Sequence, residues 1–234
     1  MTPMTSPHTP RPARLVVLDM AGTTVADDGL VEAAFTAAAT RLGEDPAPMI
    51  DHVRATMGES KISVFRHLLG GDETRAQQAN RAFEEAYGAL VHEGRIAPVP
   101  GAADAVTALR EQGRTVVLTT GFARVTQDAI LDALGWHGLA DLTLCPADAG
   151  GRGRPHPDMV LTAFLRTGAA GDVREIAVAG DTSYDMLSGA RSGAGIVAGV
   201  LTGAHDRAAL TANGATHVLP SVAALPALLA EHDS

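Results

Sequence analysis

The chain of 234 residues has one cysteine, few aromatic residues and no excess of positive charge. The single Cys145 excludes a disulfide within the chain. Eighteen basic against 27 acidic residues give a formal net charge of -9, and no cluster of Lys and Arg alternates with aromatic residues, so we do not expect nucleic acid as a partner. A small anionic substrate must then be held by local donors such as helix N-termini, single cations or a metal ion.

Long hydrophobic runs are also absent. No apolar stretch reaches the length of a membrane-spanning helix, and no signal segment opens the chain, so we expect a cytoplasmic enzyme without membrane contact. Hydrophobic residues make up 46% of the sequence and aromatic residues only 3%, which predicts a core of Ala, Val and Leu with helices packed on a sheet. This length fits one α/β domain with a smaller second domain.

The order of the apolar runs predicts the fold. Apolar runs separated by helical segments are expected to form strands at 15–18, 115–118, 142–145, 175–179, 195–200 and 217–219, followed by a helix over 221–231. Strands that alternate with helices imply right-handed βαβ units. We therefore predict an α/β fold with a Rossmann-like parallel sheet that is covered by helices on both faces.

Two further segments complete the predicted organisation. The proline-rich residues 1–13 are expected to be a disordered tail. Residues from about 30 to 97 show helical spacing throughout, without a convincing strand, and end at the hinge-like Pro98-Val99-Pro100-Gly101. We predict a core domain of residues 14–24 and 98–234, with a helical cap domain of residues 25–97 inserted in it. An apolar helix of the cap could also serve a homodimer contact.

Polar residues collect where the predicted strands end, which in a parallel sheet is the edge that forms sites. They are Asp19 after the first strand, Thr120-Gly121 after the second, Arg154 in the loop after the third, and Asp181 after the fourth with Asp185 one helical turn later. Such a set suits phosphoryl transfer, because carboxylates can hold Mg²⁺, a cation can neutralise phosphoryl oxygens, and another carboxylate can act as nucleophile. The alternative for Asp181 and Asp185 is that they cap the helix near Thr182.

These segments resemble, in order, the four sequence motifs of the haloacid dehalogenase superfamily. The resemblance covers about residues 14–230 and implies a covalent aspartyl intermediate at Asp19. It implies that Mg²⁺ is bound by Asp19, by the backbone carbonyl of Ala21 and by the acidic motif of Asp181 and Asp185. It further implies that Thr120 and Arg154 hold the phosphoryl oxygens beside Gly121, and that the helical insertion is a mobile cap.

Position 21 separates branches of this superfamily. Its phosphatases usually carry a second Asp two residues after the nucleophile, where it protonates the leaving alkoxide, but this chain has Ala21. Losing that general acid would slow ester cleavage by about 10²- to 10⁴-fold. A carbon leaving group needs an electron sink instead, and the first motif resembles that of phosphonoacetaldehyde hydrolases, which form a Schiff base with a cap lysine.

The segment Met57-Gly58-Glu59-Ser60-Lys61 resembles the one that carries this lysine, which makes Met57 and Gly58 candidate substrate contacts. Val64, Phe65 and Leu68 follow Lys61 at helical spacing, so Lys61 shares the apolar stripe of its helix. Burial and a position in the first helical turn would both lower the pKa of its amine and favour the neutral form. The alternative is a solvated lysine on the helix surface.

Two departures from that branch leave the substrate open. Phosphonoacetaldehyde hydrolases typically have a His three residues after the lysine and a Tyr after the Thr-Gly of the second motif, where this chain has Val64 and Phe122. The sequence thus predicts a magnesium-dependent hydrolase that cleaves the P–C bond of a small carbonyl phosphonate. The alternatives are a phosphatase of a small phosphate monoester such as phosphoglycolate, with Lys61 as a binding cation, and a non-catalytic phospho-acceptor like response-regulator receivers.

Overall fold

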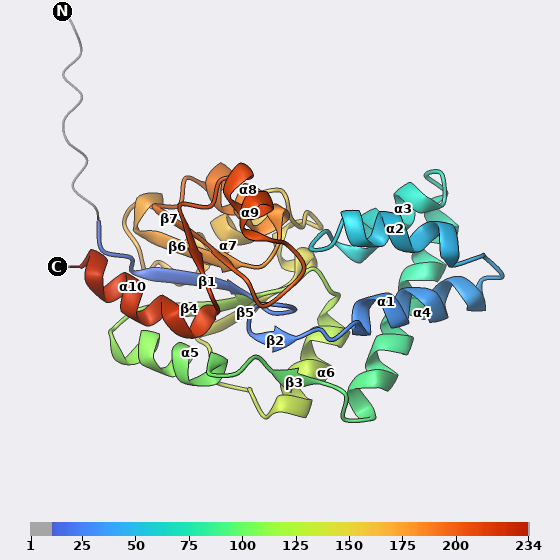
Figure 1. The fold of residues 1–234 in the computed structure, drawn as a ribbon, viewed down its shortest axis with the longest axis horizontal. Helices are drawn as coiled ribbons and strands as arrows, with labels where there is room; N and C mark the ends of the chain where they lie inside the picture. The colour runs from blue at the N-terminus through green and yellow to red at the C-terminus, as the bar shows by residue number, and fades with distance from the viewer. Residues whose placement is uncertain (1–10, 234) are drawn as a thin grey trace, which may run out of the picture.

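A parallel sheet forms the centre of this computed structural model, which describes residues 11–233 (Figure 1). Its strands are β1 (Leu15–Asp19), β4 (Thr115–Thr119), β5 (Leu142–Leu144), β6 (Ile176–Gly180), β7 (Ile196–Val200) and β8 (His217–Leu219). They lie in the order β5-β4-β1-β6-β7-β8, and every pair is parallel. The chain therefore builds the sheet outward in both directions from β1, and the predicted α/β fold is confirmed.

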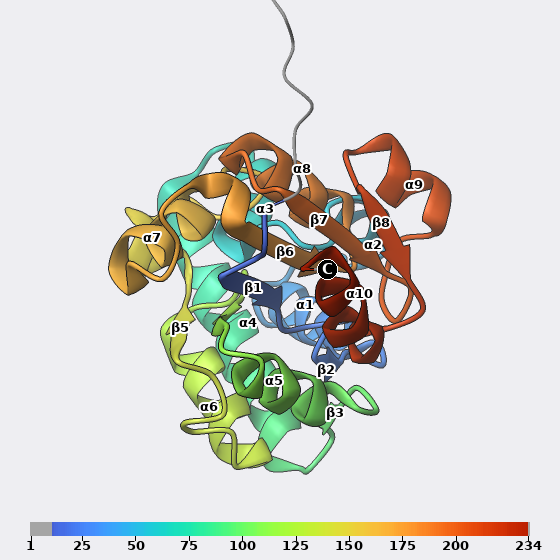
Figure 2. The ribbon, with the colours of Figure 1, turned by 90° about the vertical axis from the view of Figure 1, so that its left-hand side faces the viewer.

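Helices cover both faces of the sheet (Figure 2). One face carries α5 (Ala102–Glu111) and α10 (Leu225–His232); the other carries α7 (Asp158–Thr167) and α8 (Ser183–Ser192). Alternation along β1 explains this division, because Val16 and Leu18 pack toward α5 and α10 whereas Leu15 and Val17 pack toward α7. Two more helices, α6 (Arg124–Leu134) and α9 (Arg207–Ala212), complete the cover.

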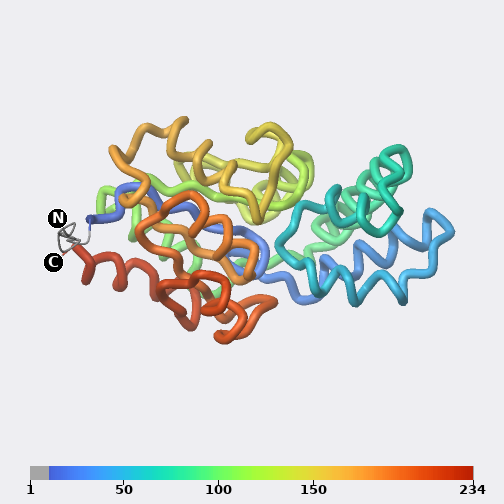
Figure 3. The backbone as a smooth tube through the Cα atoms, turned by 90° about the horizontal axis from the view of Figure 1, so that it is seen from above, coloured from blue at the N-terminus to red at the C-terminus, as the bar shows by residue number. Residues whose placement is uncertain are grey.

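The segment between β1 and α5 folds into a helical lobe at the carboxyl end of the sheet (Figures 1 and 3). It contains α1 (Leu30–Arg41), α2 (Ala47–Ala55), α3 (Lys61–Leu68) and α4 (Glu73–His92). The chain enters and leaves the lobe through a two-residue antiparallel ribbon of β2 (Val25–Ala26) and β3 (Ala97–Pro98). The sequence missed this ribbon because two residues are too few to show strand alternation. The division into core and cap domains stays a prediction.

Aromatic residues are concentrated where the lobe meets the core. Phe35 packs on Phe65 and Phe83 with ring centroids 4.7 and 4.8 Å apart, and Tyr87 packs on Phe122 of the core at 4.6 Å. The sheet itself is covered by Ala, Val and Leu, as the composition predicts. The few aromatic side chains are therefore used mainly to build the lobe and to join it to the core, where large rings bury the most area per residue.

Smaller differences from the predicted elements lie at the chain ends. Residues 1–10 are outside the described residues, but Ala13 is buried and Arg11 pairs with Asp172 at 3.2 Å. Ala13, which lies within the predicted tail of residues 1–13, is thus buried in the core, because it comes two residues before β1. The helix expected over 221–231 is a 3₁₀ turn (Val222–Ala224) followed by α10. None of the helices within residues 11–233 has the length and apolar character to cross a membrane.

Candidate active site

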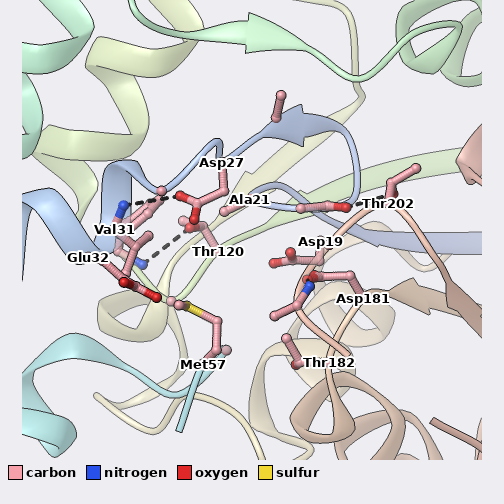
Figure 4. Close-up of a pocket in the computed structure, with 18 of the residues that line it drawn as sticks. Asp19, Ala21, Asp27, Val31, Glu32, Met57, Thr120, Asp181, Thr182 and Thr202 are labelled. Atoms are coloured by element: carbon pink, nitrogen blue, oxygen red, sulfur yellow. Dashed lines mark hydrogen bonds between the residues drawn. The ribbon is translucent and has the colours of Figure 1, made fainter. Parts of the chain in front are cut away.

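The carboxyl ends of β1, β4 and β6 deliver three of the predicted residues to one cavity of about 490 Å³. Asp19 ends β1, Thr120 follows β4 and Asp181 follows β6, and all three side chains are buried. These strands are adjacent in the sheet and flank the point where the strand order reverses, which is where open parallel sheets form sites. Figure 4 shows Asp19 and Asp181 together on one side of this cavity.

Arg154 joins two of the carboxylates. Its Nη2 lies 2.6 Å from Asp19 Oδ1, and its Nη1 donates to Asp185 Oδ1 at 2.6 Å. Its Nε is buried and donates no hydrogen bond within residues 11–233, whereas Nη2 is engaged by the Asp19 carboxylate. Because buried donors of this kind normally find acceptors, the guanidinium is suited to hold an anionic oxygen that enters beside Asp19.

Asp185 has the structural role that the sequence left open. Its Oδ2 accepts hydrogen bonds from Thr182 N at 3.1 Å and Thr182 Oγ1 at 2.5 Å, which closes a capping box at the start of α8. Its Oδ1 holds Arg154. Both oxygens already accept hydrogen bonds, so Asp185 caps α8 with one oxygen and orients the Arg154 guanidinium with the other.

Both carboxylate oxygens of Asp181 accept hydrogen bonds from neighbouring loops. Its Oδ2 accepts from Ala204 N at 2.8 Å, and its Oδ1 accepts from Thr23 Oγ1 at 3.3 Å. Burial first, and the Asp185 charge second, raise the pKa of Asp181 to about 7. Burial likewise raises the pKa of Asp19 well above its ordinary value, although the Arg154 charge opposes this. Because three buried carboxylates surround the single guanidinium of Arg154, this end of the cavity has a deficit of positive charge.

A divalent cation fits that deficit. Asp19 and Asp181 each offer a carboxylate oxygen, and these atoms lie within 4.8 Å of each other and of an oxygen of Asp185, whose oxygens already accept from Arg154 and Thr182. Oxygen donors are the ligands that Mg²⁺ prefers in proteins. Ala21, whose carbonyl was predicted as a further ligand, lines the same cavity.

The lobe supplies the other side of the cavity through Met57, Gly58 and Lys61. Gly58 has φ of +95°, and a Cβ there would lie 2.3 Å from Thr182 Oγ1 of the core. A Cβ on Gly121, after β4, would lie 3.1 Å from the Glu59 carbonyl oxygen. The predicted substrate contacts of lobe and core therefore meet, and glycine permits this close approach from both sides.

Replacing Gly58 with alanine should push the lobe away from Thr182 of the core. The left-handed backbone and the Thr182 clash together are expected to destabilise the closed lobe by about 1–3 kcal/mol and to lower activity. Gly43→Ala is the matched control, because Gly43 lies in the lobe at φ of +75° with nothing within 4 Å of its Cβ position. Thermal melting and kcat/KM for both variants separate the effects: we expect both to lose some stability but only Gly58→Ala to lose activity. Equal activity in the two variants would contradict the role given to the contact.

Lys61 is the first residue of α3, with Ser60 as N-cap, and only 6% of it is exposed. Its Nζ lies 5.4 and 5.9 Å from the ring centroids of Phe122 and Phe35, and no hydrogen bond or ion pair of Lys61 occurs within residues 11–233. Burial lowers the pKa of its amine to about 8, which a nearby charge, that of Asp27, partly opposes. The solvated-lysine alternative is thereby excluded.

Sequence reasoning missed several residues that line the cavity. Asp27, Glu32 and Arg54 lie on the lobe side, and Arg54 donates two hydrogen bonds of 2.9 Å to Glu32. Thr202 closes the core side, where its Oγ1 donates to Gly22 O at 2.7 Å. One available signal was the pair of acidic residues around the start of α1, directly after the first motif.

Comparison with known proteins assigns the site to a family. Residues 13–193 match the family described as haloacid dehalogenase-like hydrolase. The chain belongs to this family. Two conclusions follow at once: the protein is a hydrolase, and the non-catalytic receiver alternative is set aside. The four motifs predicted from the sequence all lie within the matched residues.

Relatives of this hydrolase carry two kinds of name. The chain is 32% identical over 197 residues to "Probable phosphatase IndB" of Dickeya dadantii, a match that covers 82% of each protein. It is 30% identical over 162 residues to phosphonoacetaldehyde hydrolase of Bacillus cereus, covering 67% of the chain but 60% of that protein. The family is therefore shared with both proteins, whereas the substrate of this hydrolase is not fixed by either name.

Solved structures confirm the fold. A phosphonoacetaldehyde hydrolase-like protein from Oleispira antarctica superposes with a TM-score of 0.83 at 22% identity, over 100% of this chain and 97% of that one. A hydrolase from Pseudomonas syringae gives a TM-score of 0.82 at 24% identity, over 94% and 99%. The lobe and the sheet of this hydrolase thus belong to one shared architecture.

Proposed function

We propose that this hydrolase cleaves the P–C bond of a small carbonyl phosphonate, phosphonoacetaldehyde or a relative, with Asp19 as nucleophile and Lys61 as the amine that forms a Schiff base. The observation that carries the proposal is the environment of Lys61. The only lysine of the chain is buried, has no ion-pair partner within the described residues, and lines the same cavity as Asp19. With a pKa of about 8, about one amine in ten is neutral at pH 7.

The proposed chemistry uses the two sides of the cavity in turn. Lys61 Nζ condenses with the substrate carbonyl to give a protonated imine. Asp19 then attacks phosphorus: the Asp19–P bond forms, the P–C bond breaks, and its electron pair moves into the imine, which becomes an enamine. Arg154 Nε and the Thr120 hydroxyl would hold the phosphoryl oxygens. Water hydrolyses the aspartyl phosphate, and protonation and hydrolysis of the enamine free Lys61.

Ala21 is consistent with this reaction. A carbon leaving group is stabilised by the iminium, so no acid is required at position 21, where a phosphate ester would need one. Mg²⁺ is part of the proposal: Asp19 and Asp181 would bind it, with the Ala21 carbonyl, while Asp185 positions Arg154. When bound, Mg²⁺ neutralises charge that develops on the phosphoryl oxygens.

A phosphatase of a small phosphate monoester is the second candidate. The relationship to "Probable phosphatase IndB", which extends over 82% of the chain, favours it. In that case Lys61 would remain protonated and bind an anionic group of the substrate, as a buried cation aimed into the cavity can do.

Phosphate release from a substrate panel distinguishes the two candidates. We expect release from phosphonoacetaldehyde that stops when EDTA removes Mg²⁺ and returns when Mg²⁺ is added, with slower release from phosphoglycolate and other monoesters. Release from monoesters only would favour the phosphatase. Activity that EDTA leaves unchanged would contradict the magnesium site.

A further inference from the structure

Asp27 is an acidic residue of the cavity to which neither candidate reaction has given a role. It lies between β2 and α1, half-buried, on the side of the cavity opposite Asp19 and Asp181 (Figure 4). Its Oδ1 accepts a hydrogen bond from Val31 N at 3.2 Å, which ties the carboxylate to the first turn of α1. Its Oδ2 accepts no hydrogen bond within residues 11–233. One carboxylate oxygen is therefore fixed and the other is free to exchange a proton.

Lys61 and Asp27 line the same cavity, and their charges act on each other. Among charged groups, Asp27 acts most strongly on the Lys61 amine; the others are Arg154, Asp19, Asp181 and Glu59. The charged groups that act on Asp27 are Lys61, Asp28 and Glu32, and Asp27 also interacts with the buried Tyr87 hydroxyl. The two residues come from different lobe segments, so only the tertiary structure brings them together.

The other groups near Lys61 are unsuited to take its proton. Arg154 is a cation that does not deprotonate in proteins. Asp19 is paired with Arg154, and Asp181 accepts from Ala204 N and Thr23 Oγ1. Glu59 does not line the cavity, and none of the described residues that do is a histidine. Of the other carboxylates that line the cavity, Glu32 is held by Arg54 through both oxygens and Asp28 is exposed. This leaves Asp27 as the group in the cavity that can accept and return a proton at Lys61.

We infer that Asp27 is the proton carrier of the Schiff-base reaction, an inference that rests on the function proposed above. Asp27 takes one proton from the Lys61 ammonium, which leaves a neutral amine and a carboxylic acid. The amine nitrogen attacks the substrate carbonyl carbon, and one of its protons moves to the former carbonyl oxygen to give a neutral carbinolamine. Asp27 then returns its proton to that hydroxyl, which leaves as water. The products are the protonated imine and the Asp27 carboxylate.

The environment of Asp27 matches this task. Burial is the main cause that raises the pKa of its carboxyl, while burial lowers that of the Lys61 amine to about 8. The two values approach each other, which favours transfer in both directions. Asp27 also supplies an acid–base group to a cavity that none of the histidines within residues 11–233 lines.

A characteristic pH dependence follows. The reactive pair holds one proton, so imine formation needs a pH above the pKa of Asp27 and below that of Lys61, near 8. At lower pH both groups are protonated and the ammonium has no acceptor. At higher pH both Asp27 and Lys61 are deprotonated, so no group can donate a proton to the carbinolamine hydroxyl. We expect a bell-shaped profile that falls above about pH 8.

Asp27→Asn tests the carrier with little change in shape, because an asparagine oxygen can still accept from Val31 N. The probe is acetaldehyde, and the readout is the rate at which borohydride traps an adduct on Lys61, followed by mass spectrometry. We expect Asp27→Asn to slow imine formation by about 10²- to 10⁴-fold. Its profile should rise with pH instead of falling, since the variant depends on amine that is already neutral.

Asp28→Asn is the matched control. It removes the same charge one residue away, from an exposed side chain, and asparagine tolerates the φ of 41° there. We expect Asp28→Asn to keep the rate and the bell-shaped profile, and Asp27→Glu, which retains a carboxyl group, to recover part of the rate. Melting temperatures of all variants verify that they fold.

The outcomes separate the two proposals. Equal rates and profiles for Asp27→Asn and Asp28→Asn would overturn the carrier role, as would the absence of any adduct on Lys61 in the wild-type protein. Slow imine formation in Asp27→Asn, with a rate that rises with pH, supports the carrier role. If that result comes with no phosphate release from phosphonoacetaldehyde, the proposed substrate fails while the assignment of Asp27 to Lys61 stands.

Discussion

Asp19→Asn should lower phosphate release by about 10⁴-fold or more with any substrate of this hydrolase. An amide oxygen is a poor nucleophile, so the covalent intermediate cannot form. The variant should fold, because Arg154 keeps its hydrogen bond of 2.6 Å to Asp185 when the Asp19 charge is removed. The measurement is kcat for phosphate release, with mass spectrometry of acid-quenched protein to detect the phosphorylated aspartate.

The matched control for this experiment is Asp172→Asn. Asp172 pairs with Arg174 at 2.6 Å on the surface, so its substitution removes one carboxylate without touching the cavity. We expect it to retain full activity. An Asp19→Asn protein that still releases phosphate at more than about a hundredth of the wild-type rate would remove Asp19 from the nucleophile role.

The second large effect is expected at Lys61. Lys61→Arg keeps a positive charge at the same place, but a guanidinium does not form an imine under these conditions. We expect P–C cleavage to fall by about 10³-fold or more, because the electron sink is lost. A chain with one lysine makes this test unusually clean: in the wild-type protein, Lys61 carries the only side-chain amine that borohydride can trap with an aldehyde.

Lys61→Arg also separates the two candidate functions. If Lys61 only binds an anion, arginine should preserve much of the activity and mainly change KM. If Lys61 forms a Schiff base, kcat falls and the trapped adduct disappears together. Arginine is larger than lysine and enters a site packed by Phe35 and Phe122, so Lys61→Met, which is closer in volume, shows how much of the loss is due to packing. An active Lys61→Met on phosphonoacetaldehyde would contradict the Schiff base.

Burial explains why a lysine at this place can react near neutral pH. Arginine serves as the basic residue everywhere else in the chain, and its guanidinium stays charged even when it is buried, as at Arg154. An ammonium loses its proton more readily when water is removed, and the phenyl rings around Lys61 remove it. A reactive amine therefore requires both the lysine and the aromatic cluster of the lobe.

The residues at the strand ends show which parts of the site can be predicted from the sequence. Asp19, Thr120 and Asp181 each follow an apolar run, and parallel strands place their carboxyl ends at one edge, so their meeting was predictable. The predicted strands agree with the observed ones to within one residue at each end, because short buried runs leave a strong local signal. The β2–β3 ribbon, through which the chain enters and leaves the lobe, is too short to show such a pattern in the sequence.

The sequence by itself determined the α/β fold, the place of Asp19 at the end of the first strand, the absence of an acid at position 21 and the lysine of the lobe, because each rests on local spacing or on a short motif. Only the tertiary structure decided that Asp185 holds Arg154, that Gly58 touches Thr182 and that Asp27 lines the same cavity as Lys61. These are contacts between segments distant along the chain. No periodicity records them, since they depend on how the lobe packs over the end of the sheet.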